Sequence, residues 1–203
     1  MQSLLTRIAQ QPALWATLRR IVENNYAGER AAIADELTPW REVGERRFLD
    51  FGCGTGEFAA SFPRRQYVGV DLSAGYVRYA ATVSDNQFGV MNGRALAFAD
   101  GSFDAVLVVG VVHHLDDELA RATFAELHRV LKPGGEMLVL EDIPTRDWWN
   151  LPGKAMHWLD RGDAIRTDED YQRLFAPFFT VRRSWTLRSG ICDYGVYRLL
   201  RSA

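Results

Sequence analysis

From residue 46 onward, short apolar runs alternate with amphipathic stretches along the chain. The runs are apolar almost throughout, which is typical of strands that helices cover on both faces of a sheet. Helical stretches lie between them, at Glu57–Phe62, Ala74–Val83 and Asp117–Leu131. This alternation predicts βαβ units and a parallel sheet. The runs are "RFLDF", "QYVGVDL", "QFGVM", "FDAVLVVGVV" and "GEMLVLED".

The last part of the chain breaks this alternation. The strand-like runs "PFFTVRRSWTL" and "ICDYGVYRLL" are separated by Arg188, Ser189 and Gly190 alone. This connection has no room for a crossover helix, so the two runs should pair as an antiparallel hairpin. The predicted fold is α/β, a Rossmann-like doubly wound sheet that is mostly parallel, with helices on both faces. Lys132 to Gly135 should form a turn before the fifth strand.

The chain before residue 46 is predicted to be helical. Pro12 suits a helix start, and a second helix should run from about Glu29 to Leu37 and stop before Pro39. Residues 1–40 would then form a helical cap. The first helix presents one apolar face, with residues at steps of three and four: Leu14, Trp15, Leu18, Ile21 and Val22.

Composition places the chain in a broad class. Its 203 residues with 47% hydrophobic content suit one domain, with a core at 46–142, a lid at 143–166 and a C-terminal helix and hairpin at 167–203. The net charge of −2 does not indicate a general nucleic-acid surface. Cys53 and Cys192 have neither metal spacing nor a disulfide framework. Without an apparent membrane span or signal peptide, we expect a cytoplasmic protein.

The stretch "FLDFGCGTGEF" contains the candidate ligand loop, with Gly52, Gly54 and Gly56 after an apolar run. A dinucleotide fingerprint would need a glycine where Glu57 stands, and a carboxylate there should repel a pyrophosphate. The loop therefore favours a nucleotide-like ligand without phosphate. Asp71, at the end of the next strand, can accept hydrogen bonds from ribose hydroxyls.

Four motifs in order carry a resemblance to a known family. "FLDFGCGTGEF", "YVGVDLS", "MNGRALAFADGSFDAVLVVGVVHHL" and "HRVLKPGGEMLVLED" resemble the class I S-adenosylmethionine (SAM)-dependent methyltransferases, most closely their small-molecule branch. The resemblance implies a seven-stranded sheet whose last strand is antiparallel, with SAM as cofactor and S-adenosylhomocysteine as product.

The resemblance also implies cofactor contacts. Asp71 would hold the ribose and Leu72 would pack on the adenine. Asn92 and Gly93 stand where the family commonly has an acid that contacts the adenine amine, and an asparagine oxygen can still accept that hydrogen bond. Largely through backbone groups, the methionine end would be lined by residues after the first and fourth strands: Asp50, Gly52, Cys53, Gly54, Gly110 and Val111.

Methyl transfer needs alignment and, if the acceptor must lose a proton, a base. His113 and His114 are the base candidates because they follow the fourth strand, although packing with a hydrogen bond to a neighbouring loop is the alternative. The stretch "HHLDDE" also contains a candidate metal site, formed by His114, Asp116 and Asp117. The two acids more simply begin the next helix, so we expect no metal.

Substrate contacts are expected from three places. Glu141 ends the fifth strand and could face the acceptor, or be an exposed strand-end acid. Trp148, Trp149 and His157 lie in "DWWNLPGKAMHWLDRG", a segment that could form an aromatic lid or pack in the core. Tyr26 lies where a cap helix could close over SAM.

The sequence thus predicts a methyltransferase acting on an O or N atom of a small-molecule acceptor. A non-catalytic methyltransferase fold that binds SAM or a partner is the first alternative, and a nicotinamide-dependent oxidoreductase is the second. Nucleic acid is disfavoured because the Pro-Cys and Asn-Pro-Pro-Tyr patterns of base-modifying enzymes are absent. The acceptor and the oligomeric state stay open.

Overall fold

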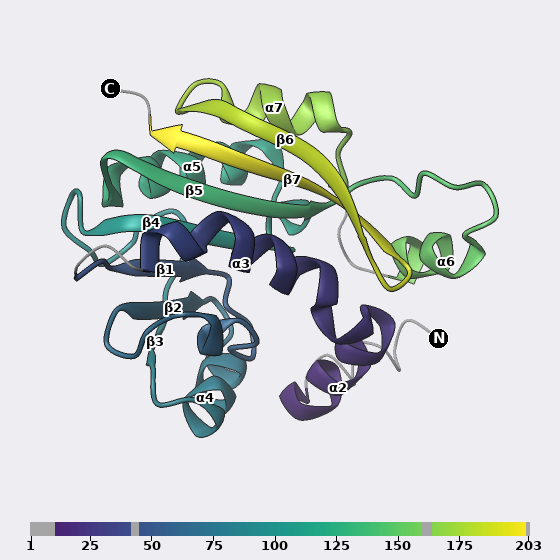
Figure 1. Ribbon diagram of the computed structural model, residues 1–203, viewed down its shortest axis with the longest axis horizontal. Coiled ribbons are helices and arrows are strands. Elements are labelled where there is room, and N and C mark those ends of the chain that lie inside the picture. Colours follow the sequence, from purple (N-terminus) through teal and green to yellow (C-terminus); the bar gives the residue numbers. More distant parts are fainter. Residues whose placement is uncertain (1–10, 42–44, 160–163, 202–203) are drawn as a thin grey trace.

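The computed structural model describes residues 11–41, 45–159 and 164–201, with the side chains of 38–41 and 156–159 left aside. Within these residues the chain forms one seven-stranded sheet in the order β3-β2-β1-β4-β5-β7-β6. Helices lie on both sides of it (Figure 1). The strands are β1 Phe48–Phe51, β2 Tyr67–Asp71, β3 Gln87–Val90, β4 Phe103–Val109, β5 Leu131–Asp142, β6 Phe179–Ser189 and β7 Cys192–Arg201.

The pairing confirms the predicted sheet. Strands β1 to β5 pair with one another in parallel, whereas β7 runs antiparallel to both β5 and β6. Strands β6 and β7 form the predicted hairpin, and β7 is inserted between β5 and β6. Strand order reverses on the two sides of β1 and β4, so a ligand crevice is expected beyond their carboxyl ends.

The two faces of the sheet have separate apolar cores. Helix α3 (Ala27–Arg41) packs Ile33 and Leu37 on one face, against strand residues such as Leu107. On the other face, α5 (Asp117–Val130) and α7 (Asp168–Phe175) bury Phe124 and Phe175. The other α-helices in the described residues are α2 (Pro12–Val22), α4 (Ala74–Val83) and α6 (Leu151–Leu159).

The predicted helices are confirmed at α2, α4 and α5. Asp116 caps α5, its Oδ1 accepting a hydrogen bond from the Leu119 N–H at 2.8 Å. The helix predicted at Glu57–Phe62 is wrong, because the chain makes turns there and then one short 3₁₀ helix, Ala59–Ser61. The buried Phe58 and Phe62 gave the segment a helical spacing, but they flank this single turn.

Two predicted boundaries also differ. Helix α3 continues through Pro39 to Arg41, so the proline lies in its last turn and does not end the helix before it, although it removes one backbone donor. The turn expected at 132–135 is an irregularity within β5. From Phe103 to Ala105 the β4 pairing advances from Leu131 to Glu136, so the β5 residues between them bulge out of the ladder.

Helix α3 packs against one face of the sheet. Helix α2 instead lies near the carboxyl ends of the parallel strands. A sharp kink separates the two helices. Asn24, Asn25 and Tyr26 have φ of 49°, 57° and 57°, a left-handed conformation that costs about 1–2 kcal/mol per residue. In Figure 1, α2 and α6 both lie on the side to which β5 runs.

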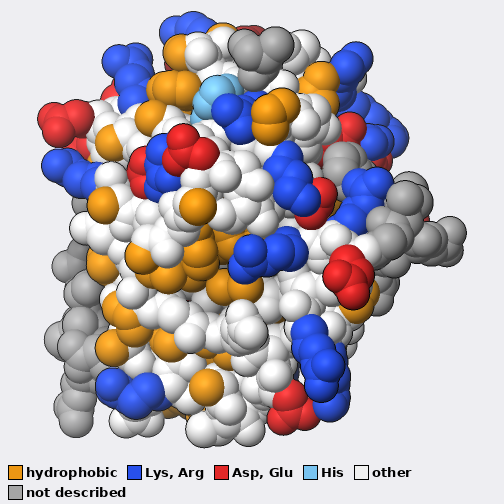
Figure 2. All heavy atoms as spheres, turned by 90° about the vertical axis from the view of Figure 1, so that its left-hand side faces the viewer, with side chains coloured by type: hydrophobic (Ala, Val, Ile, Leu, Met, Phe, Trp, Pro, Cys, Tyr) orange, Lys and Arg blue, Asp and Glu red, His pale blue; other side chains and the backbone are white. Residues whose placement is uncertain are grey.

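Figure 2 views the opposite edge, where the parallel strands begin. Lys, Arg, Asp and Glu side chains are intermixed there, so this face carries no field of a single sign. None of the helices that the structure describes combines the length and apolar character needed to cross a membrane.

Candidate functional site

The glycine loop after β1 touches the loop after β4. The Gly52 and Cys53 N–H groups donate to the Val70 carbonyl at 2.8 and 3.0 Å, which ties the loop to β2. A Cβ on Gly52 would overlap the Val111 side chain. Gly54 has a φ of +52°, and nothing lies within 4 Å of where its Cβ would be. A ligand could therefore approach the backbone at Gly54 closely.

Asp71 joins this loop to the end of β2. Its Oδ2 accepts a hydrogen bond from the Gly54 N–H at 2.9 Å, and its Oδ1 accepts one from Ser73 N–H at 2.7 Å. Burial raises the pKa of Asp71, while these backbone donors oppose that rise. Each carboxylate oxygen has a second lone pair, so the group can still accept from a ligand hydroxyl.

The residues expected around the adenine continue along the same edge. Leu72 is 72% exposed, an unusual place for a large apolar side chain. Asn92 is exposed, and its Oδ1 accepts a hydrogen bond from the Arg94 N–H at 3.0 Å. Gly93 packs so tightly that a Cβ would lie 2.6 Å from Thr123 Oγ1.

A buried polar cluster supports the loop after β4. Glu141 Oε1 accepts hydrogen bonds from the Val111 and Val112 N–H groups at 2.8 and 2.7 Å. Its Oε2 lies 2.9 Å from His113 Nδ1, and both side chains are fully buried. The exposed His114 ring lies 4.0 Å from the His113 ring, centroid to centroid. Glu141 thus fixes the backbone that presents both histidines.

Comparison with known proteins identifies the family. A family model described as "Methyltransferase domain" matches residues 49–139. A "putative methyltransferase" of Encephalitozoon cuniculi is 34% identical over 183 residues, which cover 89% of this chain and 69% of that protein. The chain belongs to the class I SAM-dependent methyltransferases.

Other relatives of this methyltransferase are matched over part of their length. A ubiquinone/menaquinone biosynthesis C-methyltransferase of Desulfotalea psychrophila is 37% identical over 51% of this chain and 44% of its own. A malonyl-[acyl-carrier protein] O-methyltransferase of Hahella chejuensis is 34% identical over 67% of this chain and 50% of its own. The chain therefore spans about half the length of these two relatives.

Solved structures share the methyltransferase fold. Magnesium protoporphyrin IX methyltransferase from Synechocystis, with bound S-adenosylhomocysteine, has a TM-score of 0.70 at 16% identity, covering 91% of this chain and 87% of its own. The PH0226 protein from Pyrococcus horikoshii has a TM-score of 0.63 at 20% identity, covering 93% and 98%. At these identities the likeness concerns the fold.

Asp50, in the first methyltransferase motif, lies beneath the glycine loop. It is 1% exposed, and the Tyr67 hydroxyl donates to its Oδ2 at 2.6 Å. Burial raises its pKa to about 7, although the Tyr67 hydrogen bond opposes the rise. Cys53 is also buried, and burial raises the pKa of its thiol. The Asp50 carboxylate therefore faces the interior of the methyltransferase, where it ties β1 to Tyr67 on β2.

Glu57 has a different role from the one the sequence suggested. Its carboxylate pairs with Arg20 of α2 at 2.9 Å and with Arg30 of α3. The prediction that Glu57 would repel a pyrophosphate is wrong, because two guanidinium groups neutralise its carboxylate. A different feature disfavours a dinucleotide. The three-residue 3₁₀ helix offers no helix N-terminus for a pyrophosphate.

Two of the expected substrate residues are packed inside the methyltransferase. Glu141 is fully buried under the loop after β4, so it supports that loop and does not reach an acceptor. Tyr26 is 8% exposed, and its ring packs edge-on against Phe58 at 5.5 Å. Glu141 is held inward by the N–H groups of the loop after β4, and Tyr26 by its ring contact with Phe58.

The aromatic segment behaves differently. Trp148 and Trp149 are 83% and 58% exposed, and the Arg188 guanidinium lies 5.5 Å from the Trp149 ring. The core-packing alternative for these two side chains is wrong. His157 belongs to α6, and its side chain, like that of Trp158, lies outside the described residues.

Arg19 of α2 is a site residue that the sequence did not single out. Its Nη2 lies 3.8 Å from where a Cβ of Gly110 would be, and its guanidinium pairs with Glu23. The Arg19 Nη2 also donates to the Tyr194 hydroxyl at 3.3 Å. In the sequence it is one of two adjacent arginines on the polar side of a helix, and only the tertiary fold separates their roles.

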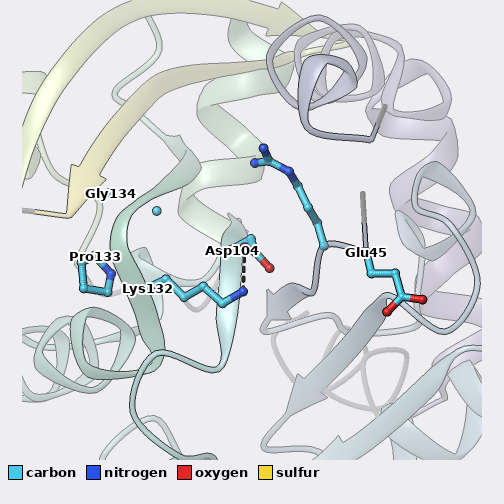
Figure 3. Close-up of a pocket in the computed structure, with 7 residues that line it drawn as sticks. Glu45, Asp104, Lys132, Pro133 and Gly134 are labelled. Carbon is cyan, nitrogen blue, oxygen red and sulfur yellow. Dashed lines mark hydrogen bonds and ion pairs between the residues drawn. The ribbon is translucent and has the colours of Figure 1, made fainter. Parts of the chain in front are cut away.

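A pocket of about 400 Å³ lies at the opposite edge, between the beginnings of β4 and β5 (Figure 3). Asp104 and Lys132 form an ion pair across it at 2.8 Å, and Glu45 lines it as well. It lies at the ends of β4 and β5 opposite to those that carry the glycine loop, Asp71 and the loop after β4. In the described part of the chain, no three His, Cys, Asp or Glu side chains are grouped to hold a metal ion.

Proposed function

We propose that this chain transfers a methyl group from SAM to an O or N atom of a small-molecule acceptor. The observation that carries the proposal is the open cradle at Gly54, whose N–H is held by Asp71 and beside which no atom lies within 4 Å of a Cβ position. A cofactor with a ribose and no phosphate fits a loop that Asp71 borders and that no long helix follows.

Bound SAM would supply an electrophilic methyl group on a sulfonium. The residues of the chain contribute position. Asp71 would orient the ribose, Leu72 would cover one adenine face, and the backbone at Gly52, Gly54 and Gly110 would admit the methionine tail. Such alignment accounts for a large part of the acceleration in a displacement reaction.

Among the base candidates, His114 is the better placed. It is exposed at the end of the loop after β4, and its ring lies against that of His113 at a tilt of 46°, while His113 Nδ1 faces Glu141. His113 is fully buried and serves as a positioning residue in this proposal. An acceptor hydroxyl or ammonium would lose its proton to His114, directly or through one water.

The exposed Trp148 and Trp149 suit an acceptor with an apolar body, because tryptophan supplies a large flat contact surface. Relatives include enzymes named for C-methylation, O-methylation and, over shorter stretches, tRNA methylation. A tRNA acceptor would need a basic surface, which the net charge of −2 does not favour.

Calorimetric titration with SAM, S-adenosylhomocysteine and NADH tests the cofactor. We expect the first two to bind. Asp71→Ala should weaken SAM binding by about 1.5–3 kcal/mol, the scale of a hydrogen bond to a charged group. The matched control is Asp85→Ala, an acid at 75% side-chain exposure that pairs with Arg64 far from the loop, and it should leave affinity unchanged.

Each alternative has its own outcome in this experiment. Binding of NADH without SAM would overturn the proposal in favour of an oxidoreductase. Binding of SAM with no S-adenosylhomocysteine formed from any small-molecule acceptor would favour the non-catalytic fold. Equal affinity in wild type and a folded Asp71→Ala variant would show that Asp71 does not hold the ribose.

A further inference from the structure

The guanidinium of Arg19, a residue outside the methyltransferase motifs, lies against the loop after β4. Arg19 lies in the third turn of α2, and its side chain is 14% exposed. Its Nη2 lies 3.8 Å from the position of a Gly110 Cβ, while the same position is 3.7 Å from His113 Cε1. The guanidinium thus covers the backbone that is proposed to meet the methionine end of SAM.

This guanidinium is held in place by the fold. Glu23, one helical turn later, pairs with Arg19 Nε, and Tyr194 on β7 accepts a hydrogen bond from its Nη2 at 3.3 Å. Tyr194 in turn donates to Glu23 Oε2 at 2.9 Å. Burial opposes the charge on Arg19, but Glu23, Tyr194 and Asp142 outweigh it and raise the pKa well above its usual value.

The helix carrying Arg19 is fixed over the site by independent contacts. The neighbouring Arg20 pairs with Glu57 beside the glycine loop at 2.9 Å. At the C-terminal end of α2, the Ile191 N–H donates to the Val22 carbonyl at 3.2 Å, and the Ser189 hydroxyl donates to the Glu23 carbonyl at 2.9 Å. Arg19 is therefore a preorganised charge, which reduces the entropy that a ligand must overcome.

The geometry points to Arg19 as the residue that binds the carboxylate of the cofactor's methionine tail. This inference rests on the proposed function and deepens it. A guanidinium has N–H groups in a planar fork, so it can serve Glu23, Tyr194 and a ligand carboxylate together. The tail is a zwitterion, and the buried carboxylates around Arg19 suit its ammonium group.

A pair of ligands isolates this contact. SAM and decarboxylated SAM differ only in the carboxylate, and both keep the ammonium and the sulfonium. Calorimetric titration of wild type and Arg19→Gln with each ligand therefore measures the interaction directly. We expect Arg19→Gln to weaken SAM binding by about 10- to 100-fold, the scale of a charge-assisted hydrogen bond, and to change decarboxylated SAM binding by less than about threefold.

Two further variants separate binding from structure. Arg19→Gln leaves Glu23 buried without its cation, so Arg19→Gln/Glu23→Gln removes both charges and should show the same selective loss. Arg20→Gln loosens the docking of α2 on Glu57, and it should weaken both ligands to the same degree. Thermal unfolding of each variant checks that it is folded.

The outcomes are distinct. Selective loss of SAM binding in both Arg19 variants supports the inference. Equal weakening of the two ligands, or no change in a folded variant, would overturn it and leave SAM binding by the protein intact. If wild type binds neither ligand, the proposed function fails first, and this inference fails with it.

Discussion

The two edges of the sheet treat charge in opposite ways. At the carboxyl ends of the parallel strands, acids are taken out of solvent and arranged around loops. At the amino ends, charges such as Asp104 and Lys132 meet across an open pocket in a simple ion pair (Figure 3). Six acids at or near the first edge are at most 3% exposed: Glu23, Glu29, Asp50, Glu141, Asp142 and Asp193.

The contrast is visible in the pKa values of two aspartates on adjacent strands. Burial raises the pKa of Asp50 to about 7. For Asp104 burial acts in the same direction, but the Lys132 ammonium and the Arg47 N–H outweigh it and lower its pKa. Burying an acid costs stability unless hydrogen bonds or a paired charge offset the cost, and acids with raised pKa values are concentrated at functional sites. The comparison shows that the acid at the carboxyl-end edge is buried against a hydroxyl, whereas the acid at the amino-end edge is held in a partly exposed ion pair.

The largest predicted effect comes from two glycines with the same backbone angle. Gly52 and Gly134 have φ of +74° and +73°, but a Cβ would overlap Val111 at Gly52 and meet nothing within 4 Å at Gly134. Gly52→Ala should cost roughly 2–5 kcal/mol, from backbone strain plus overpacking. Gly134→Ala should cost about 1–2 kcal/mol from strain alone. Chemical denaturation measures both, and equal costs would contradict the crowding argument.

Glu141→Gln should have the next largest effect. The carboxylate accepts hydrogen bonds from the Val111 and Val112 N–H groups and faces His113, all without solvent. An amide offers one acceptor oxygen in place of two, so we expect a loss of about 2–4 kcal/mol in unfolding free energy. With saturating cofactor the variant should also lose turnover, measured with any acceptor found active. If the Glu141→Gln variant had both the stability and the turnover of the wild type, the loop would not depend on the Glu141 carboxylate.

The third prediction uses pH. The folded-state pKa of Asp50, about 7, lies above its unfolded value near 4, so the folded state binds more protons between these values. Through Asp50, stability therefore falls as pH rises from 4 to 7. Asp50→Asn, which can still accept from Tyr67, should remove this fall in stability, which is on the order of 4 kcal/mol between these two pKa values. Denaturation at several pH values measures it, and an unchanged slope would refute the assignment.

Asp104→Asn is the matched control for Asp50→Asn, and we expect it to have the smallest effect on stability. The pKa of Asp104 is lowered, so its contribution is present above its unfolded pKa and is lost as pH falls through the folded pKa. Because the ion pair with Lys132 is partly exposed, we expect less than about 1 kcal/mol. A loss as large as that of the carboxyl-edge variants would remove the distinction between the edges.

Much of the fold could be predicted from the sequence. Near-continuous apolar runs identified the parallel strands, and the short Arg188–Gly190 connection identified the hairpin. Both signals are local, since they depend on spacing alone. The helix predicted at Glu57–Phe62 failed because the apolar spacing of Phe58 and Phe62 fits a single turn as well as a helix. Two glycines at positive φ before it, Gly54 and Gly56, leave the chain no regular start.

The site was less accessible to sequence reasoning. The motif loops could be located, because they follow apolar strands. The roles of Glu57, Glu141 and Arg19 could not, since each depends on a partner far away in the chain. Glu57 meets α2 and α3, Glu141 meets the loop after the neighbouring strand, and Arg19 meets Tyr194. A charged residue in a sequence carries no mark of which partner the tertiary structure will supply.

The insertion of β7 between β5 and β6 has a consequence for the order of assembly. Glu23 and Tyr194, which hold Arg19 over the loop after β4, are 171 residues apart along the chain. During synthesis, the motif strands β1 to β4 can leave the ribosome and pair long before β7 exists. The Arg19 guanidinium is fixed by Tyr194 only when the β6–β7 hairpin, which is made last, packs onto the sheet. Contacts of such high sequence separation form slowly, so cofactor affinity should appear as a late step in refolding, after most of the sheet has formed.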